Sequence, residues 1–187
     1  MEFLTVLWLP ILLSAVLVFV ASSIIHMVLK YHNSDYGLLP GEDAVLATMR
    51  EQGVGPGMYA FPRASSLKEM GEPGMIAKYE QGPVGSMTVG PNGPPAMGKS
   101  LFLWFLYAVL IGVFAGYLGF VTRGPGAEYL AVFRITGTVA VLGHAVGYLV
   151  DGIWKGVSWG SVFKNVFDGL IYGLLTAGTF AWLWPEI

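Results

Sequence analysis

The sequence contains no cysteine, and this absence excludes several kinds of chemistry at once. Disulfide bonds, thiolate nucleophiles, iron–sulfur clusters and cysteine-based zinc sites all require the missing thiol. Histidine occurs only as His26, His32 and His144, so a metal site made of histidines alone would be hard to build. The sequence also lacks an HExxH motif and a Ser-His-Asp arrangement, which are common signs of a hydrolase. We therefore expect no metal site and no catalytic residues, and we predict that the protein is not an enzyme.

Charged residues are scarce as well. They make up 12% of the 187 residues, against about 25% in an ordinary soluble domain. Hydrophobic residues make up 55%, and the mean hydropathy is +0.63. The formal net charge of −2 gives no electrostatic basis for binding nucleic acid. This composition predicts an integral membrane protein whose first partner is the lipid bilayer.

Four long apolar runs are predicted to form transmembrane helices. A helix needs about 20 residues, at ~1.5 Å each, to cross the ~30 Å hydrocarbon core of a bilayer. The four runs cover residues 1–29, 99–122, 128–151 and 161–184. We therefore expect an all-α membrane protein, a bundle of four transmembrane helices, with an ordered cytoplasmic insertion between helices 1 and 2.

The expected insertion, residues 30–98, differs in composition from the rest of the chain. It holds 12 of the 26 glycines and 8 of the 11 prolines, which is typical of connecting segments. Acidic residues before an apolar face predict a short helix over residues 41–52. Two short apolar runs around a Gln-Gly-Pro turn suggest a β-hairpin over residues 75–89. The methionines of this segment are scattered, so we interpret them as packing residues rather than as copper ligands.

Basic residues are distributed unevenly over the expected connections. With four spans, the insertion and the connection between helices 3 and 4 lie on the same side of the membrane. That side, with its flanking residues, carries Lys30, Arg50, Arg63, Lys68, Lys78, Lys99, Lys155 and Lys164. The connection on the opposite side carries only Arg123, and basic residues favour the cytoplasmic side. We therefore expect a multi-pass protein of the cell (inner) membrane, with both termini outside and residues 30–98 in the cytoplasm.

Small residues recur at every fourth position on two of the predicted spans. Such stripes allow the backbones of membrane helices to approach closely. The stripes consist of Ala108, Gly112 and Gly116 on the second span and of Gly169, Gly173 and Ala177 on the fourth. They predict close helix packing, either within one molecule or between the molecules of an oligomer.

The third span contains an imidazole, that of His144. Ionisable groups at membrane depth are costly, so each one is a functional hypothesis. A helix turns ~100° per residue, which places Tyr148 and Asp151 on the same face as His144. Asp168 and Tyr172 lie one turn apart on the fourth span, near the same membrane edge. These five side chains are candidates for a proton or cation path; alternatively, both aspartates are solvated and the imidazole makes one hydrogen bond between helices.

His26 and His144 are also candidate ligands of a haem. Both are expected one to two turns inside the cytoplasmic edge, on different spans, and ligation of a b-type haem by two histidines needs such matched depth. Haem binding would make the protein an electron-transfer subunit. Apart from this hypothesis, no cofactor is expected.

Residues 93–100, GPPAMGKS, match the spacing of a phosphate-binding loop, GxxxxGK[ST]. Pro94 and Pro95 lack the N–H groups that would bind phosphate, and the helix that follows is a predicted span. We therefore do not predict nucleotide binding.

The function expected from these patterns is that of a non-enzymatic subunit that assembles with itself or with partner membrane proteins. The small-residue stripes, the Gly/Pro-rich insertion and the lack of a catalytic set support this expectation. Two alternatives stay open. One is a small proton or cation channel or transporter that uses His144, Asp151 and Asp168, and the other is the haem-binding subunit.

Overall fold

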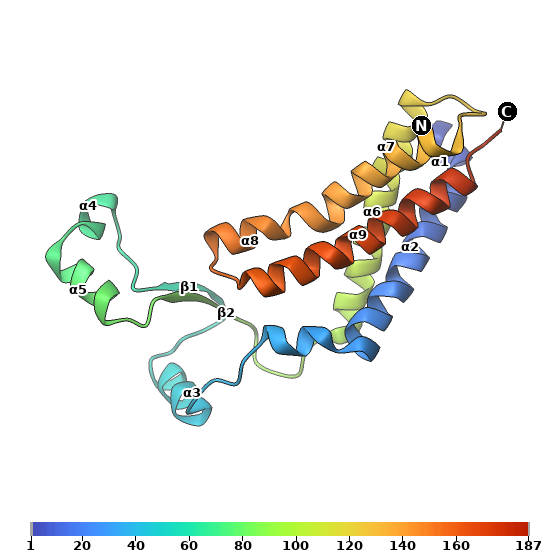
Figure 1. Ribbon diagram of the computed structural model, residues 1–187. Helices are drawn as coiled ribbons and strands as arrows, with labels where there is room; N and C mark the ends of the chain where they lie inside the picture. Colours follow the sequence, from blue (N-terminus) through green and yellow to red (C-terminus); the bar gives the residue numbers. More distant parts are fainter. Residues whose placement is uncertain (1, 187) are drawn as a thin grey trace. The chain divides into compact units, whose positions relative to one another are not determined.

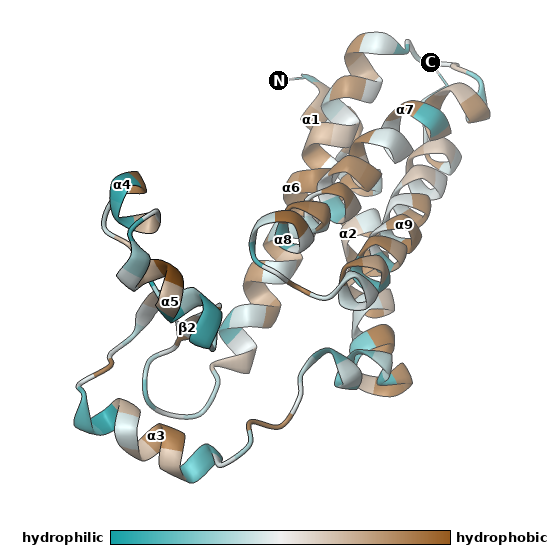
Figure 2. Ribbon diagram, turned by 60° about the vertical axis from the view of Figure 1, so that its left-hand side comes forward, coloured by the Kyte–Doolittle hydropathy of each residue, from teal (hydrophilic) through white to brown (hydrophobic). Residues whose placement is uncertain are grey.

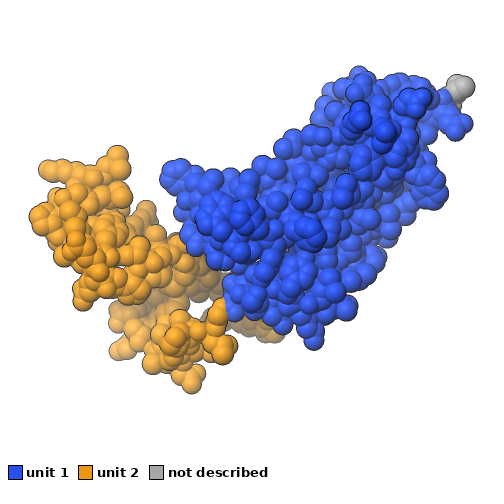
Figure 3. All heavy atoms as spheres, viewed as in Figure 1, with its two compact units in different colours: residues 1–36, 96–187 blue, residues 37–95 orange. Residues whose placement is uncertain are grey.

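The computed structural model describes residues 2–186, and the chain divides into two compact units (Figure 3). The first unit contains residues 1–36 and 96–187, and the second contains residues 37–95. Most of the described residues are helical, which confirms the predicted helical character of the chain.

The first unit is built from long helices (Figure 1). The chain passes through α1 and α2, and then through a π-helical segment, η1, and a short 3-10 helix, η2. It continues through α6, then through a second long stretch made of α7, the π-helical segment η3 and α8, and ends with α9. The bounds are α1 Glu2–Val6, α2 Trp8–Ser23, η1 Ile24–Leu29, η2 Tyr31–Asp35, α6 Met97–Thr122, α7 Tyr129–Val141, η3 Leu142–Val146, α8 Tyr148–Trp154 and α9 Trp159–Trp182.

Three helical stretches of this unit are long and apolar enough to cross a membrane. They are Trp8–Leu29, Met97–Thr122 and Tyr129–Trp154. Apolar residues cover much of their length (Figure 2). These stretches coincide with the first three predicted spans, so the sequence pattern identified them correctly as apolar helices.

The helix α9 differs from these three stretches, because Lys164, Asn165 and Asp168 interrupt the apolar residues of its first half. It packs against α2, α7, η3 and α8, and it has more buried residues than any other helix that the structure describes. A helix that is surrounded by other helices can carry polar groups on its inner face. The main apolar cluster joins α9 to its neighbours and consists of Leu7, Ile11, Ala115, Val132, Phe180, Ala181 and Trp184.

Both small-residue stripes lie inside this unit. A Cβ atom added at Gly112 would lie 3.2 Å from the backbone oxygen of Ile11 on α2. One added at Gly169 would lie 2.6 Å from Cα of Ala145 in η3. The other members of the stripes are buried as well, namely Ala108, Gly116, Gly173 and Ala177. The stripes therefore serve packing within one molecule.

The second unit, residues 37–95, contains three short helices and a two-stranded antiparallel sheet. Its strands pair with Gly57 opposite Val89 and with Phe61 opposite Gly85. The bounds are α3 Glu42–Glu51, β1 Gly57–Phe61, α4 Leu67–Met70, α5 Pro73–Gln81 and β2 Gly85–Val89. The helix α3 lies where the acidic start and the apolar face predict one.

The hairpin predicted over residues 75–89 is wrong in its first strand, because residues Pro73–Gln81 form the helix α5. Pro73 occupies the first position of that helix, where a missing N–H is harmless and the fixed φ favours helix. Gly82, with a positive φ of 62°, follows the last helical residue. The second strand forms as β2, but its partner β1 comes from earlier in the chain.

Candidate cation site

Asp168 provides the buried carboxylate at the centre of the candidate site. The residue is only 2% exposed. Its Oδ1 atom accepts a hydrogen bond from the hydroxyl of Tyr31, and its Oδ2 atom lies 2.7 Å from Nε2 of His32. Burial and the neighbouring Asp168 carboxylate raise the pKa of Tyr31, so this hydroxyl keeps its proton at neutral pH. A buried carboxylate is unfavourable without hydrogen bonds or positive charge, and these two partners compensate for it.

A reversal of the chain after the first apolar helix brings Tyr31 and His32 to α9. The segment η1 is followed by Lys30, whose φ of 55° lies in the left-handed region. A residue other than glycine rarely adopts this conformation, and here it leads the chain into η2. His32 and Asp168 are 136 positions apart in the sequence, so the site follows from this turn and not from a local motif.

Asp35 provides a second carboxylate, on the other side of His32. Its Oδ2 atom lies 2.6 Å from Nδ1 of His32, and its Oδ1 atom accepts hydrogen bonds from Lys164 Nζ at 2.8 Å and from Ser161 Oγ at 2.9 Å. Burial raises the pKa of Asp35, but the hydrogen bonds from Lys164, His32 and Ser161 outweigh burial and lower this pKa to about 2. Asp35 is therefore ionised at neutral pH and holds η2 against α9.

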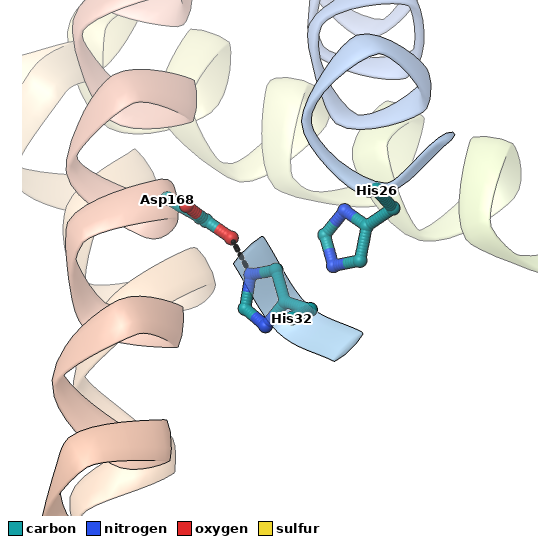
Figure 4. Close-up of side chains that lie close together, drawn as sticks. All are labelled: His26, His32 and Asp168. Atoms are coloured by element: carbon teal, nitrogen blue, oxygen red, sulfur yellow. Dashed lines mark hydrogen bonds and ion pairs between the residues drawn. The ribbon is translucent and has the colours of Figure 1, made fainter. Parts of the chain in front are cut away.

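His26 lies beside His32 and Asp168 (Figure 4). Its ring stacks on that of His32, with the ring centroids 4.5 Å apart and an angle of 4° between the ring planes. Its Nδ1 atom lies 3.0 Å from the backbone oxygen of Ser22. One ligand atom from each of His26, His32 and Asp168 lies within 4.8 Å of the other two, so this group could hold a metal ion.

Three cavities lie around the candidate site. One of about 530 Å³ is lined by His26 and His32, and one of about 460 Å³ is lined by His26 and Asp168. The third, of about 480 Å³, is lined by His144. Tyr148 lines all three. Asp168 is thus shielded from bulk water and still borders a cavity that a small cation could enter.

His144 lies within a cage of aromatic rings. The ring centroids of Trp104, Tyr107 and Tyr172 are 5.9, 5.6 and 5.6 Å from that of His144. His144 is 4% exposed, and within residues 2–186 neither of its ring nitrogens has a hydrogen-bond partner. The hydroxyl of Tyr172 likewise has no partner in the described part of the chain. Buried polar atoms are normally paired, so these three atoms are available to a water molecule, a proton or a ligand that enters the cage.

Two of the three histidines lie in π-helical segments. His26 belongs to η1 and His144 belongs to η3. A π turn is rare and often marks a functional site within a helix. This supports a functional role for both imidazoles.

The structure brings together most of the side chains predicted to form an ion path. The rings of His144 and Tyr172 are in contact, and Tyr172 lies one turn beyond Asp168 on α9. Tyr148 is half-buried and lines the cavities beside them. The inner part of the predicted path therefore consists of Asp168, Tyr172 and His144.

Asp151, the fifth predicted member, lines the third cavity together with His144 and Tyr148 but is less buried than Asp168. Its side chain is 33% exposed and forms an ion pair with Lys155 at 2.7 Å, one turn later on the same helix. This matches the alternative interpretation, in which Asp151 is a solvated residue. The same interpretation does not describe Asp168, which is buried, or His144, which makes no hydrogen bond to another helix within residues 2–186.

The two predicted haem ligands lie in different surroundings. His26 stacks on His32, whereas His144 is enclosed by aromatic rings. None of the three cavities described above is lined by both residues. Haem binding stays a prediction.

The sequence patterns gave no reason to select Tyr31, His32 or Asp35, because these residues follow the last apolar residue of the first run. The signal that could have found them is the spacing of Lys164 and Asp168. Two charged residues four positions apart lie on one face of a helix, and inside a predicted span they require compensating groups nearby.

Removal of the unpaired hydroxyl by Tyr172→Phe is expected to stabilise the protein by about 1 kcal/mol, because a buried polar atom without a partner is lost. The matched control is Tyr107→Phe in the same aromatic cage. The Tyr107 hydroxyl donates a hydrogen bond to the backbone oxygen of Gly143, so its removal should destabilise the protein. Thermal unfolding in mild detergent measures both effects. A decrease in stability for Tyr172→Phe would mean that its hydroxyl is paired, for example with an ordered water molecule.

No protein-family model, no curated protein and no solved structure matches the chain.

Proposed function

We propose that this protein is an integral membrane protein of four spans that takes up a cation at the Asp168 carboxylate and passes it into the helix bundle. The observation that carries the proposal is the placement of Asp168, which is almost fully buried and borders a cavity of about 460 Å³. A carboxylate at such a position attracts a cation strongly, because little water competes with it.

The fourth span in this proposal is α9. Its 24 residues correspond to ~36 Å of helix, which exceeds the ~30 Å core of a bilayer. Its exposed large apolar residues, Phe163, Phe167, Leu170 and Leu174, recur with helical spacing and form one outward stripe. Lipid would cover this stripe, while Lys164 and Asp168 lie on the protected side.

The route for the cation begins at the cluster of Asp168 and His32 and continues past Tyr172 to His144. A proton can pass between a hydroxyl and an imidazole, and among the described residues neither the Tyr172 hydroxyl nor the His144 ring has a hydrogen-bond partner. The excess of basic residues supports a cytoplasmic location for residues 30–98, with both termini outside. The cluster then lies at the cytoplasmic end of the route, and no catalytic step is part of the proposal.

Ion flux into liposomes that contain the purified protein tests this function. Asp168→Asn preserves the size of the side chain but removes its negative charge, so flux should fall to the level of protein-free vesicles. The matched control is Asp43→Asn on the exposed surface of α3, which should retain wild-type flux. The proposal is wrong if the wild type carries neither protons nor metal cations faster than empty vesicles, or if Asp168→Asn carries them at the wild-type rate.

A second candidate function is that of a subunit that assembles with partner membrane proteins. The observation in its favour is the weak core of residues 37–95, in which Met75 is the only buried residue. Leu38 and Leu67 of the same unit are 98% and 88% exposed. Native mass spectrometry of the gently solubilised protein tests this candidate, since a mixed complex or homo-oligomer supports it and a bare monomer removes it.

A further inference from the structure

We infer that the cation is a divalent transition-metal ion, such as Zn²⁺, and that His26, His32 and Asp168 are its ligands. This inference rests on the proposed function, because it names the class of cation that the same site takes. Two imidazoles and one carboxylate form a common ligand set for catalytic or exchangeable zinc. Alkali and alkaline-earth cations prefer oxygen ligands, so two imidazoles disfavour them.

In both imidazoles an oxygen acceptor faces Nδ1, so Nε2 is the atom of each ring that would bind the ion. Nδ1 of His26 faces the backbone oxygen of Ser22, and a carbonyl can only accept, so this nitrogen carries a proton and donates. Nδ1 of His32 faces the carboxylate of Asp35 in the same manner. Nε2 of His26 can then provide a lone pair, whereas Nε2 of His32 now faces Oδ2 of Asp168 at 2.7 Å and donates to it, so an ion that binds between these two atoms must displace that proton. Metal-binding histidines typically show this arrangement, in which a carboxylate or backbone oxygen orients the ring from behind.

The distances need only small adjustments to accept an ion. Ligand atoms ~2.0–2.1 Å from a tetrahedral zinc lie about 3.3 Å from one another. Nε2 of His32 and Oδ2 of Asp168 are now 2.7 Å apart, so an ion between them requires a separation that is larger by about 0.6 Å. His26 must approach the other two, and its side chain is exposed to solvent.

The position of His26 argues against a purely structural ion pair. A protonated His32 between Asp35 and Asp168 would be a complete structural unit without a second imidazole. His26 nevertheless stacks on His32, with the ring centroids 4.5 Å apart, which places a second imidazole beside the pair of His32 and Asp168. The open side of the group faces the cavities, which supplies the free fourth position of an exchangeable site.

Metal binding to the full chain, purified in mild detergent without a polyhistidine tag, tests the inference. Titration with Co²⁺, which replaces zinc in tetrahedral sites, should give visible absorption bands at one ion per chain, and Zn²⁺ should abolish them. His26→Ala, His32→Ala and Asp168→Asn should each reduce the affinity by at least 100-fold. Asp35→Asn should reduce it by about 10–100-fold, because it removes an orienting carboxylate. Asp43→Asn is the control that should retain wild-type affinity.

The outcomes separate this inference from the proposed function. Absence of Co²⁺ and Zn²⁺ binding, or binding that none of the three ligand substitutions weakens, overturns the inference. If His32→Ala and Asp168→Asn weaken binding but His26→Ala does not, the assigned ligand set is wrong. Metal binding without flux in liposomes supports the inference and removes the transport function. Proton flux without metal binding supports the transport function and overturns the inference.

Discussion

Replacement of Gly169 by alanine is expected to destabilise the protein by about 1–3 kcal/mol. A Cβ atom at this position would lie 2.6 Å from Cα of Ala145 and 2.6 Å from the backbone oxygen of His144. Both are main-chain atoms, so no side-chain rotation relieves the contact and α9 must move away from η3. Thermal unfolding in mild detergent measures the effect as a lower midpoint temperature.

The matched control for this substitution is Gly147→Ala in the same long helical stretch. A Cβ atom added at Gly147 has no neighbour within 4 Å, and the residue has a helical φ of −57°. Alanine is favoured over glycine in a helix by up to about 1 kcal/mol, so Gly147→Ala should raise the midpoint slightly. The two substitutions should thus have opposite signs. Equal effects would show that the helices do not approach each other at Gly169.

Replacement of Asp35 by asparagine is expected to destabilise the protein by about 2–3 kcal/mol, because hydrogen bonds to a buried charged group are lost. Asp35 accepts hydrogen bonds from Lys164 and Ser161 of α9, and its side chain is only 10% exposed. The control is Asp151→Asn, which breaks an exposed pair within one helix and should change the stability by at most about 0.5 kcal/mol. Equal effects of the two substitutions would show that η2 is not held to α9 by Asp35.

The effect of Asp35→Asn should also depend on pH. The pKa of Asp35 falls from an ordinary value of 3.8 to about 2 in the folded protein, so the stabilisation is complete above pH ~4 and disappears as the pH falls to about 2. The stability difference between the wild type and the variant should therefore shrink across this range. A difference that stays constant down to pH 2 would show that Asp35 is not ionised in the folded state.

The helices were the predictable part of this fold. Apolar runs mark the long helices because a helix in a membrane must expose apolar side chains over its full length. The sequence did not reveal that α9 is the most buried helix. Its lower hydropathy reflects polar groups that its neighbours protect, whereas the more apolar third run, Tyr129–Trp154, has a more exposed surface.

The candidate site was only partly predictable. Asp168, Tyr172 and His144 follow from the rule that polar groups inside a predicted span have a function or a partner. The same rule does not predict His32 and Asp35. These residues reach the candidate site through the left-handed conformation of Lys30, which no sequence pattern indicates. The expectation that no metal site exists stays a prediction; it considered histidines alone, whereas the group of His26, His32 and Asp168 includes a carboxylate.

The π-helical segment at His144 has a consequence for helical-wheel diagrams of this chain. A π turn holds about one residue more than an α turn, so the residues that follow it are rotated by ~100° relative to a regular helix. A wheel drawn through Leu142–Val146 as a regular helix therefore misplaces the residues of α8 by this angle relative to those of α7. Deleting one residue from this segment would restore the regular phase and rotate α8 by ~100° relative to α7. The length of this one turn therefore sets which side chains of the third stretch face the polar interior.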